Sequence, residues 1–227
     1  VLRGGQPTIA FENISTQQEV KELEIQLSKA ETLKLNELLR QSGITINTLM
    51  QGVWGMLLAS LTGREDVIFG TPISGRFANI SSIDEHIGLF SNTIPVRIQL
   101  EANRGLIEQL VSHQQTQVQL LEHDVLGLGE IQQLANGETL FDTLLVVENY
   151  PDNTDWYKKD YQGARLTDIH NRGYTHYPLT MLVLPGETLH ILFEYRDTEG
   201  VAQHIVKQFK QVLKKVIDDS DKPVSQW

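Results

Sequence analysis

The sequence predicts an α/β fold, a two-layer sandwich in which helices pack on a mixed β-sheet. Strand and helix patterns alternate early in the chain, whereas strand patterns follow one another near its end. That order is typical of a sheet with both parallel and antiparallel neighbours. The 227 residues are 40% hydrophobic and 21% charged, an ordinary globular composition that is long enough for one core.

The first elements are a strand and two helices. Charged and apolar residues alternate in residues 19–27, which is typical of a half-buried strand. Ser28 and Glu31 have the spacing of a capping box, and Gly43 can end the following helix in a left-handed conformation, so we expect a helix over residues 29–42. A second helix, over residues 47–62, is apolar on nearly every face, which predicts burial in the core.

Two strands and two helices come next. Residues 66–70 and 94–100 are short apolar runs and predict strands, separated by a polar loop. An amphipathic helix is predicted after Asn103, with apolar residues at helical spacing as far as Leu121. A weaker helix is predicted over residues 128–134.

The last part of the chain is dominated by strand patterns. A continuous buried strand is predicted over residues 141–147, followed by a projecting loop. Three further strands and a closing helix are then expected, at residues 164–170, 177–184, 188–196 and 201–217. The loop itself covers residues 149–163 and is rich in Pro, Asp, Asn and Gly.

Composition argues against several classes of function. A net charge of −10 would repel polyphosphates, so we expect no nucleic-acid partner. The longest apolar stretch, residues 49–61, is shorter than the roughly 20 residues that span a bilayer, so we expect no membrane partner. The chain has no cysteine and begins at Val1 without a leader, which favours a cytoplasmic segment of a longer polypeptide.

Searches for catalytic patterns find no complete set. Phosphate-binding glycine motifs, the nucleophile elbow of α/β hydrolases and His-Glu-x-x-His metal motifs do not occur, and we predict no metal site. None of the seven histidines has an aspartate four residues later, the pattern by which several acyltransferases orient a catalytic base. His190 and Glu194 come nearest, but on a strand they would lie about 13 Å apart.

Five segments carry a resemblance to a known family. They are GITINTL at residues 43–49, LTGREDVIFG at 61–70, SGR at 74–76, IGLFSNTIPVR at 87–97 and FDTLLVVENYP at 141–151. In order and spacing they resemble the condensation domains of nonribosomal peptide synthetases. The resemblance covers residues 1–227 but corresponds only to the C-terminal lobe of such a domain. It implies a chloramphenicol acetyltransferase-like fold, with residues 1–18 forming an extended arm from the inter-lobe linker.

The resemblance implies a function shared between two lobes. In this family the substrate tunnel runs between the lobes, and an aminoacyl amine on one carrier protein attacks a peptidyl thioester on another. The catalytic HHxxxDG motif belongs to the N-terminal lobe and is absent from this sequence. The chain is therefore expected to contain no catalytic residue, to be inactive alone, and to form one wall of the tunnel.

Matching motifs assign the expected tunnel residues. They are Ser74, Arg76, Gly88, Phe90, Ser91, Asn92 and Thr93. Ser91 and Asn92 would lie closest to the chemistry, although Arg76 has the alternative role of an ion pair or loop anchor and Asn92 that of a turn or cap. The stretch after Gly88 resembles peptide-bond-forming members more than epimerisation or heterocyclisation relatives.

The resemblance also implies the partners. These are the N-terminal lobe, donor and acceptor peptidyl carrier proteins with their phosphopantetheine arms, and an adjoining adenylation domain, with no cofactor bound directly. Residues 149–163 and the strand after them resemble the segment that crosses to the other lobe, and a mobile surface loop is the alternative. The lysines of the last helix present either a solvated face or a carrier-protein contact. Two alternatives are a non-catalytic carrier-protein docking module and a small stand-alone acyltransferase, so whether the isolated chain is an enzyme stays open.

Overall fold

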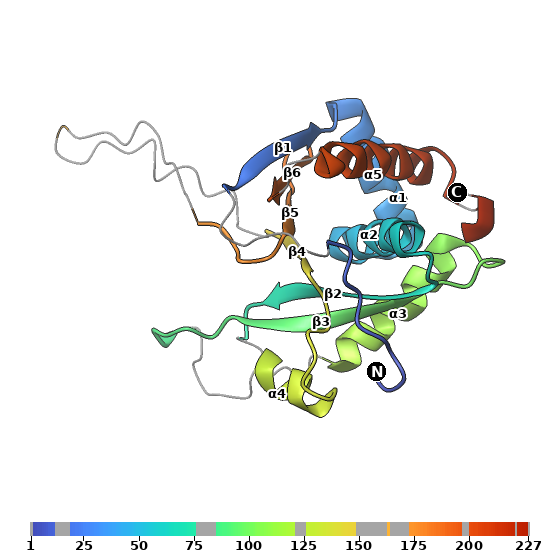
Figure 1. Ribbon diagram of the computed structural model, residues 1–227. Coiled ribbons are helices and arrows are strands. Elements are labelled where there is room, and N and C mark those ends of the chain that lie inside the picture. Colours follow the sequence, from blue (N-terminus) through green and yellow to red (C-terminus); the bar gives the residue numbers. More distant parts are fainter. Residues whose placement is uncertain are drawn as a thin grey trace.

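One mixed sheet with helices on it forms the protein, as the sequence predicts (Figure 1). The computed structural model describes residues 2–11, 19–75, 85–120, 126–148, 163, 173–196, 200–220 and 222–226. Within these residues, α1, α2, α3 and α5 share one hydrophobic core with one face of the sheet. Helix α4 lies against the other face, together with the N-terminal segment.

The sheet contains six strands in the order β1-β6-β5-β4-β2-β3. Their bounds are β1 Lys21–Gln26, β2 Asp66–Ile73, β3 Asn92–Gln99, β4 Thr143–Val147, β5 Leu179–Leu184 and β6 His190–Tyr195. Strand β4 is parallel to both β2 and β5, and the other neighbours are antiparallel. The mixed sheet inferred from the order of strand and helix patterns is therefore confirmed.

The helices begin and end close to the predicted residues. Their bounds are α1 Lys29–Ser42, α2 Ile46–Thr62, α3 Leu106–Leu120, α4 Leu128–Leu134 and α5 Val201–Asp218, followed by a 3-10 helix, Val224–Gln226. Ser28 and Glu31 form the expected capping box, and Gly43 ends α1 at φ 66°. Among the described helices none is long and apolar enough to cross a membrane alone; α1 and α2, bent by 101°, meet that length and composition only together.

The two strands next to the predicted tunnel residues are longer than the sequence pattern indicates. Strand β2 continues to Ile73 and β3 begins at Asn92, because these residues still pair across the antiparallel ladder. The pairing partner, rather than the local apolar run, sets these bounds. The predicted strand at 164–170 lies outside the described residues, as does the loop at 149–163 apart from Gly163.

Alternation along the strands separates the two faces of the sheet. In β2, Val67 and Phe69 join the core beneath the helices, whereas Ile68 joins the smaller cluster beneath α4. Trp54 of α2 and Phe209 of α5 are fully buried, with ring centroids 6.5 Å apart. Large aromatic side chains of this kind bury much apolar surface and hold α2 and α5 on the sheet.

The N-terminal segment is part of the sandwich. Thr8 bridges to Phe141, and its hydroxyl accepts a hydrogen bond from the Ile68 amide at 2.8 Å. The Phe11 amide donates to Asp142 Oδ2 at 2.6 Å. Residues 2–11, part of the predicted arm at residues 1–18, therefore satisfy the Ile68 amide of β2 and hydrogen-bond to Asp142, just before β4.

We expect a pH-dependent stability that originates at His113. This α3 side chain lies 2.8 Å from buried Gln51 of α2, with Nε2 donating to Gln51 Oε1, and burial lowers the pKa of His113 from 6.5 to about 4. The unfolded chain therefore binds a proton first as the pH falls, so stability is full above about pH 6.5 and is lost towards pH 4.

Urea unfolding at pH 7 and pH 5 measures this effect. The free energy of unfolding should fall by about 2 kcal/mol more in the wild type than in His113→Gln, which keeps an amide donor but does not titrate. Equal pH dependence in both proteins would contradict a neutral buried His113.

Candidate functional site at the β2–β3 corner

Antiparallel pairing brings the two groups of predicted tunnel residues together. Ile73 lies opposite Asn92 and Pro72 opposite Thr93, at the end of β2 and the start of β3. Ser74 and Gly75 continue from β2 on one side, and Phe90 and Ser91 lead into β3 on the other. Five of the seven predicted residues, Ser74, Phe90, Ser91, Asn92 and Thr93, thus meet at one corner of the sheet.

The close approach at this corner depends on Gly75. Its backbone has φ +62°, in the left-handed region that favours glycine. A Cβ at this position would overlap the carbonyl oxygen of Phe90. The sequence motif therefore contains a glycine here because the chain leaving β2 lies directly against the backbone of Phe90.

Asn92 connects the corner to the segment before α4. Its Nδ2 donates to the backbone carbonyl of Leu126 at 2.8 Å, across 34 residues of sequence. Asn92 is the first residue of β3, and this bond gives its side chain a structural role beside the one predicted for it in the tunnel. Its amide is a positioned, half-buried group whose donor holds a neighbouring segment.

The approach to β3 exposes two large apolar side chains. Ile87 and Leu89 are 104% and 92% exposed, and Gly88 between them is also exposed. Phe90 is half-buried, and its ring lies 3.3 Å from the position that a Cβ on Gly88 would occupy. Residues 87–89 therefore form an exposed apolar surface next to the corner.

The corner offers neutral hydrogen-bonding groups and no titrating side chain from Gly88 to Thr93. Hydroxyls of Ser91 and Thr93 and the amide of Asn92 can bind carbonyl or amide groups, but they are not general bases at neutral pH. Arg76 lies outside the described residues. The neutral groups of residues 88–93 therefore suit binding and orientation of a polar substrate.

A cavity of about 540 Å³ adjoins the corner, and no sequence pattern predicted it. Leu126, which accepts the Asn92 bond, lines this cavity together with Ile94 and Pro95 of β3. The remaining walls come from residues 2–7, the end of α3, α4 and residues 135–140 after α4. Since these segments are far apart in the sequence, no local pattern predicts their meeting.

The histidine and glutamate that come nearest to a catalytic pair do not interact. His190 Nδ1 lies 2.5 Å from Glu24 Oε1 of β1, and its Nε2 contacts Gln26 and Thr188. Burial, followed by the nearby Glu22, raises the pKa of Glu194. Within the described ranges, no group of three or more His, Cys, Asp or Glu side chains could hold a metal ion.

Comparisons with known proteins agree with this fold and these motifs. A family model described as the condensation domain matches residues 6–227. Vanchrobactin synthetase VabF of Vibrio anguillarum is 62% identical over 227 residues, which are 100% of this chain and 8% of that protein.

Two solved structures show the same fold. A holo four-domain nonribosomal peptide synthetase bound to AMP and glycine has a TM-score of 0.79 at 16% identity, over 98% of this chain and 18% of that one. The first condensation domain of the calcium-dependent antibiotic synthetase, in complex with a substrate analogue, has a TM-score of 0.73 at 15% identity, over 97% of this chain and 51% of that one. The chain belongs to the condensation domain family of nonribosomal peptide synthetases, of which it is a portion.

Proposed function

We propose that the chain is the C-terminal lobe of a peptide-bond-forming condensation domain and forms one wall of its substrate tunnel. The observation that carries this proposal is the family match over residues 6–227, combined with coverage of about half of a solved condensation-domain chain. The motifs at residues 74–76 and 87–97, which resemble those of this lobe, support it. The catalytic HHxxxDG motif does not occur in the sequence, so the base is expected from the N-terminal lobe.

The β2–β3 corner is the part of this wall that acts on substrate. Ser91, Asn92 and Thr93 would hydrogen-bond the thioester or amide groups of the two carrier-bound chains and hold them for attack. These three side chains are uncharged, which fits a role in binding alone, because the other lobe would supply the proton acceptor. Exposed Ile87 and Leu89 would be covered by that lobe.

The partners follow from the same proposal. They are the N-terminal lobe, donor and acceptor carrier proteins whose phosphopantetheine arms enter the tunnel, and an adjoining adenylation domain, all in the cytoplasm. The coding sequence before Val1 tests the lobe assignment, because HHxxxDG must lie within roughly 200 residues upstream in a domain of two similar lobes. An upstream region without that motif would contradict the assignment and favour a docking module or a small stand-alone acyltransferase.

Replacing Asn92 should slow amide formation without unfolding the domain. In the complete condensation domain, Asn92→Ala removes hydrogen bonds at the corner, and a loss of about 1–2 kcal/mol corresponds to a roughly 5- to 30-fold lower rate. The measurement is product formation from two loaded carrier proteins, with Asn36→Ala on the exposed face of α1 as the matched control. A rate equal to that of the control would remove Asn92 from the proposed site.

A further inference from the structure

Helix α5 carries a stripe of lysines on its exposed face. Lys207, Lys210 and Lys214, here called the lysine stripe, are spaced three and four residues apart and are exposed. The opposite stripe of α5 is buried in the core and includes Phe209 and Leu213. The lysine stripe therefore projects from a helix that the core holds in place.

Neither ion pairs nor the helix dipole account for this stripe. In the described part of the chain, none of its three lysines forms a close ion pair, and only Lys210 and Lys214 have an acidic neighbour, Glu31, at longer range. The dipole favours cations only in the last turn of a helix, and Lys207 and Lys210 precede that turn of α5. Like charges three and four residues apart on a helix are mildly destabilising, so the spacing of the three lysines does not itself stabilise α5.

A groove between α1 and α5 runs beside the stripe. Its cavity of about 300 Å³ has apolar walls from Leu27, Leu213 and Ile217 and a cationic edge from Lys34, Lys210 and Lys214. The two acidic side chains that line it already have partners. Glu31 accepts bonds from the backbone and hydroxyl of Ser28, which lower the pKa of its carboxyl, and nearby Lys214 and Lys210 lower that pKa further. Asp218 lies 3.6 Å from Lys34.

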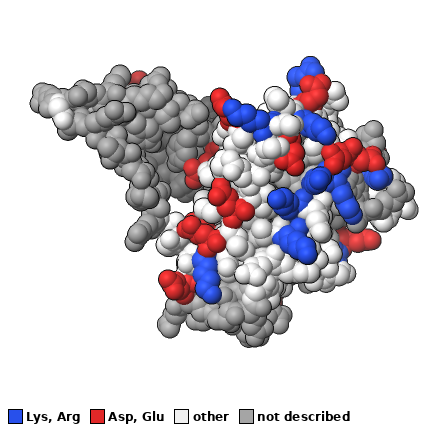
Figure 2. Space-filling model, turned by 90° about the horizontal axis from the view of Figure 1, so that it is seen from above, with Lys and Arg blue, Asp and Glu red and all other residues white. Residues whose placement is uncertain are grey.

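Cations gather on this side of an acidic protein. Figure 2 shows several Lys and Arg side chains close together on the right of the view from above, with Asp and Glu side chains among them. Helix α5 contains four lysines and one aspartate, whereas the whole chain has a net charge of −10. A local positive field of this kind attracts and orients an acidic partner and repels a basic one.

We propose that the lysine stripe and the adjoining α1–α5 groove bind an acidic amphipathic helix from another domain of the synthetase. Along α5, at 1.5 Å per residue, the axial separation is about 4.5 Å from Lys207 to Lys210 and about 6 Å from Lys210 to Lys214. This spacing matches Asp or Glu at positions i, i+3 or i+4, and i+7 of a facing helix. Apolar residues between those acids would enter the groove beside Leu213 and Ile217. This partner rests on the proposed function, since it assumes that the chain is part of a synthetase.

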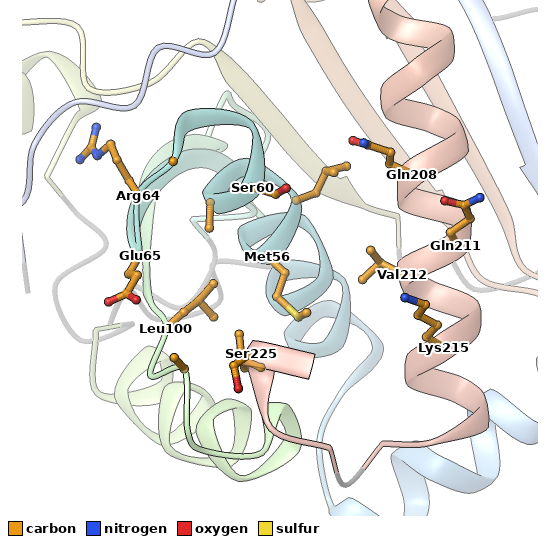
Figure 3. Close-up of a pocket in the computed structure, with 15 residues that line it drawn as sticks. Met56, Ser60, Arg64, Glu65, Leu100, Gln208, Gln211, Val212, Lys215 and Ser225 are labelled. Atoms are coloured by element: carbon orange, nitrogen blue, oxygen red, sulfur yellow. The ribbon is translucent and has the colours of Figure 1, made fainter. Parts of the chain in front are cut away.

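Lys215 provides a matched control on the same helix. It lines a separate cavity of about 430 Å³ between α5, the end of α2 and the 3-10 helix, where Met56 and Ser225 lie opposite it (Figure 3). Lys215 is exposed, as the lysine stripe is. Reversing the charges of Lys215 and of Lys222, which lies beyond α5, changes the net charge of the chain as much as reversing Lys210 and Lys214 does, but leaves the stripe intact.

Zero-length carbodiimide cross-linking in the full synthetase tests the proposal. Mass spectrometry should find Lys210 and Lys214 joined to Asp or Glu residues at helical spacing in one other domain. The double variant Lys210→Glu with Lys214→Glu should lower the yield of cross-links from Lys207 to that domain at least fivefold. The double variant Lys215→Glu with Lys222→Glu should change that yield less than twofold, and salt at 0.5 M should lower it in the wild type.

Three outcomes would overturn the proposal. They are cross-links only to Glu31 and Asp218 of the same chain, cross-links scattered over several domains, and equal loss in both double variants. The proposal would also be overturned if no cross-link to a protein formed and a 20-base-pair DNA duplex, or phosphatidylglycerol vesicles at the same concentration, competed for the lysine stripe. Amide formation is measured on the same wild-type preparation, so its absence contradicts the proposed function, whereas its presence without specific cross-links contradicts the docking helix alone.

Discussion

Gly75→Ala should lower both the stability and the activity of the condensation domain more than any other single methyl group added at the β2–β3 corner. A left-handed conformation costs a residue with a Cβ about 1–2 kcal/mol, and the Phe90 carbonyl oxygen occupies the place of the new methyl group. Separating the two segments adds a packing cost, so we expect a total of roughly 2–5 kcal/mol. The same separation displaces Ser91 and Asn92 from the tunnel wall, and amide formation should fall at least tenfold.

Gly63→Ala is the control for the free-energy cost of placing a residue with a Cβ in the left-handed conformation. Gly63 ends α2 at φ +67°, close to the value at Gly75, but no atom lies within 4 Å of its Cβ position. Thermal unfolding should therefore show a shift of about 2–8 °C for Gly63→Ala and a clearly larger one for Gly75→Ala. Equal shifts would show that the contact with Phe90 contributes nothing.

Local patterns were sufficient to predict most of the elements. The capping box at Ser28 and the glycine after Ser42 define α1 to the residue, because caps and left-handed glycines act over a few neighbouring residues. The uniformly apolar α2 was predicted as a core helix, and its buried Trp54 and Leu58 confirm this. Signals of this kind need no knowledge of the partner segment.

Strand ends and the cavity depend on distant partners and could not be predicted in that way. Strand β3 begins at Asn92 because Ile73 lies opposite it, and the predicted start at Ile94 followed only the apolar run. The bond between Asn92 and the Leu126 carbonyl joins segments 34 residues apart. At the site itself, the motifs named the residues of the corner, whereas the sheet register was needed to show that they meet.

The second large effect concerns the dependence of activity on the other lobe. If this chain is one wall of a shared tunnel, it lacks a catalytic base, and a base contributes about 10²–10⁴ in rate. The isolated chain, given aminoacyl and peptidyl groups on two carrier proteins, should therefore form amide no faster than the uncatalysed reaction. The wild-type chain mixed with a separately produced N-terminal lobe should restore product formation.

That mixing experiment tests the central claim most directly. Amide product is quantified by mass spectrometry for the chain alone, the N-terminal lobe alone and the two together, with an N-terminal lobe whose HHxxxDG histidines are replaced by alanine as the control. The account predicts product only from the mixture of intact lobes. Product from the chain alone, or from the mixture with the histidine-free lobe at an undiminished rate, would contradict it.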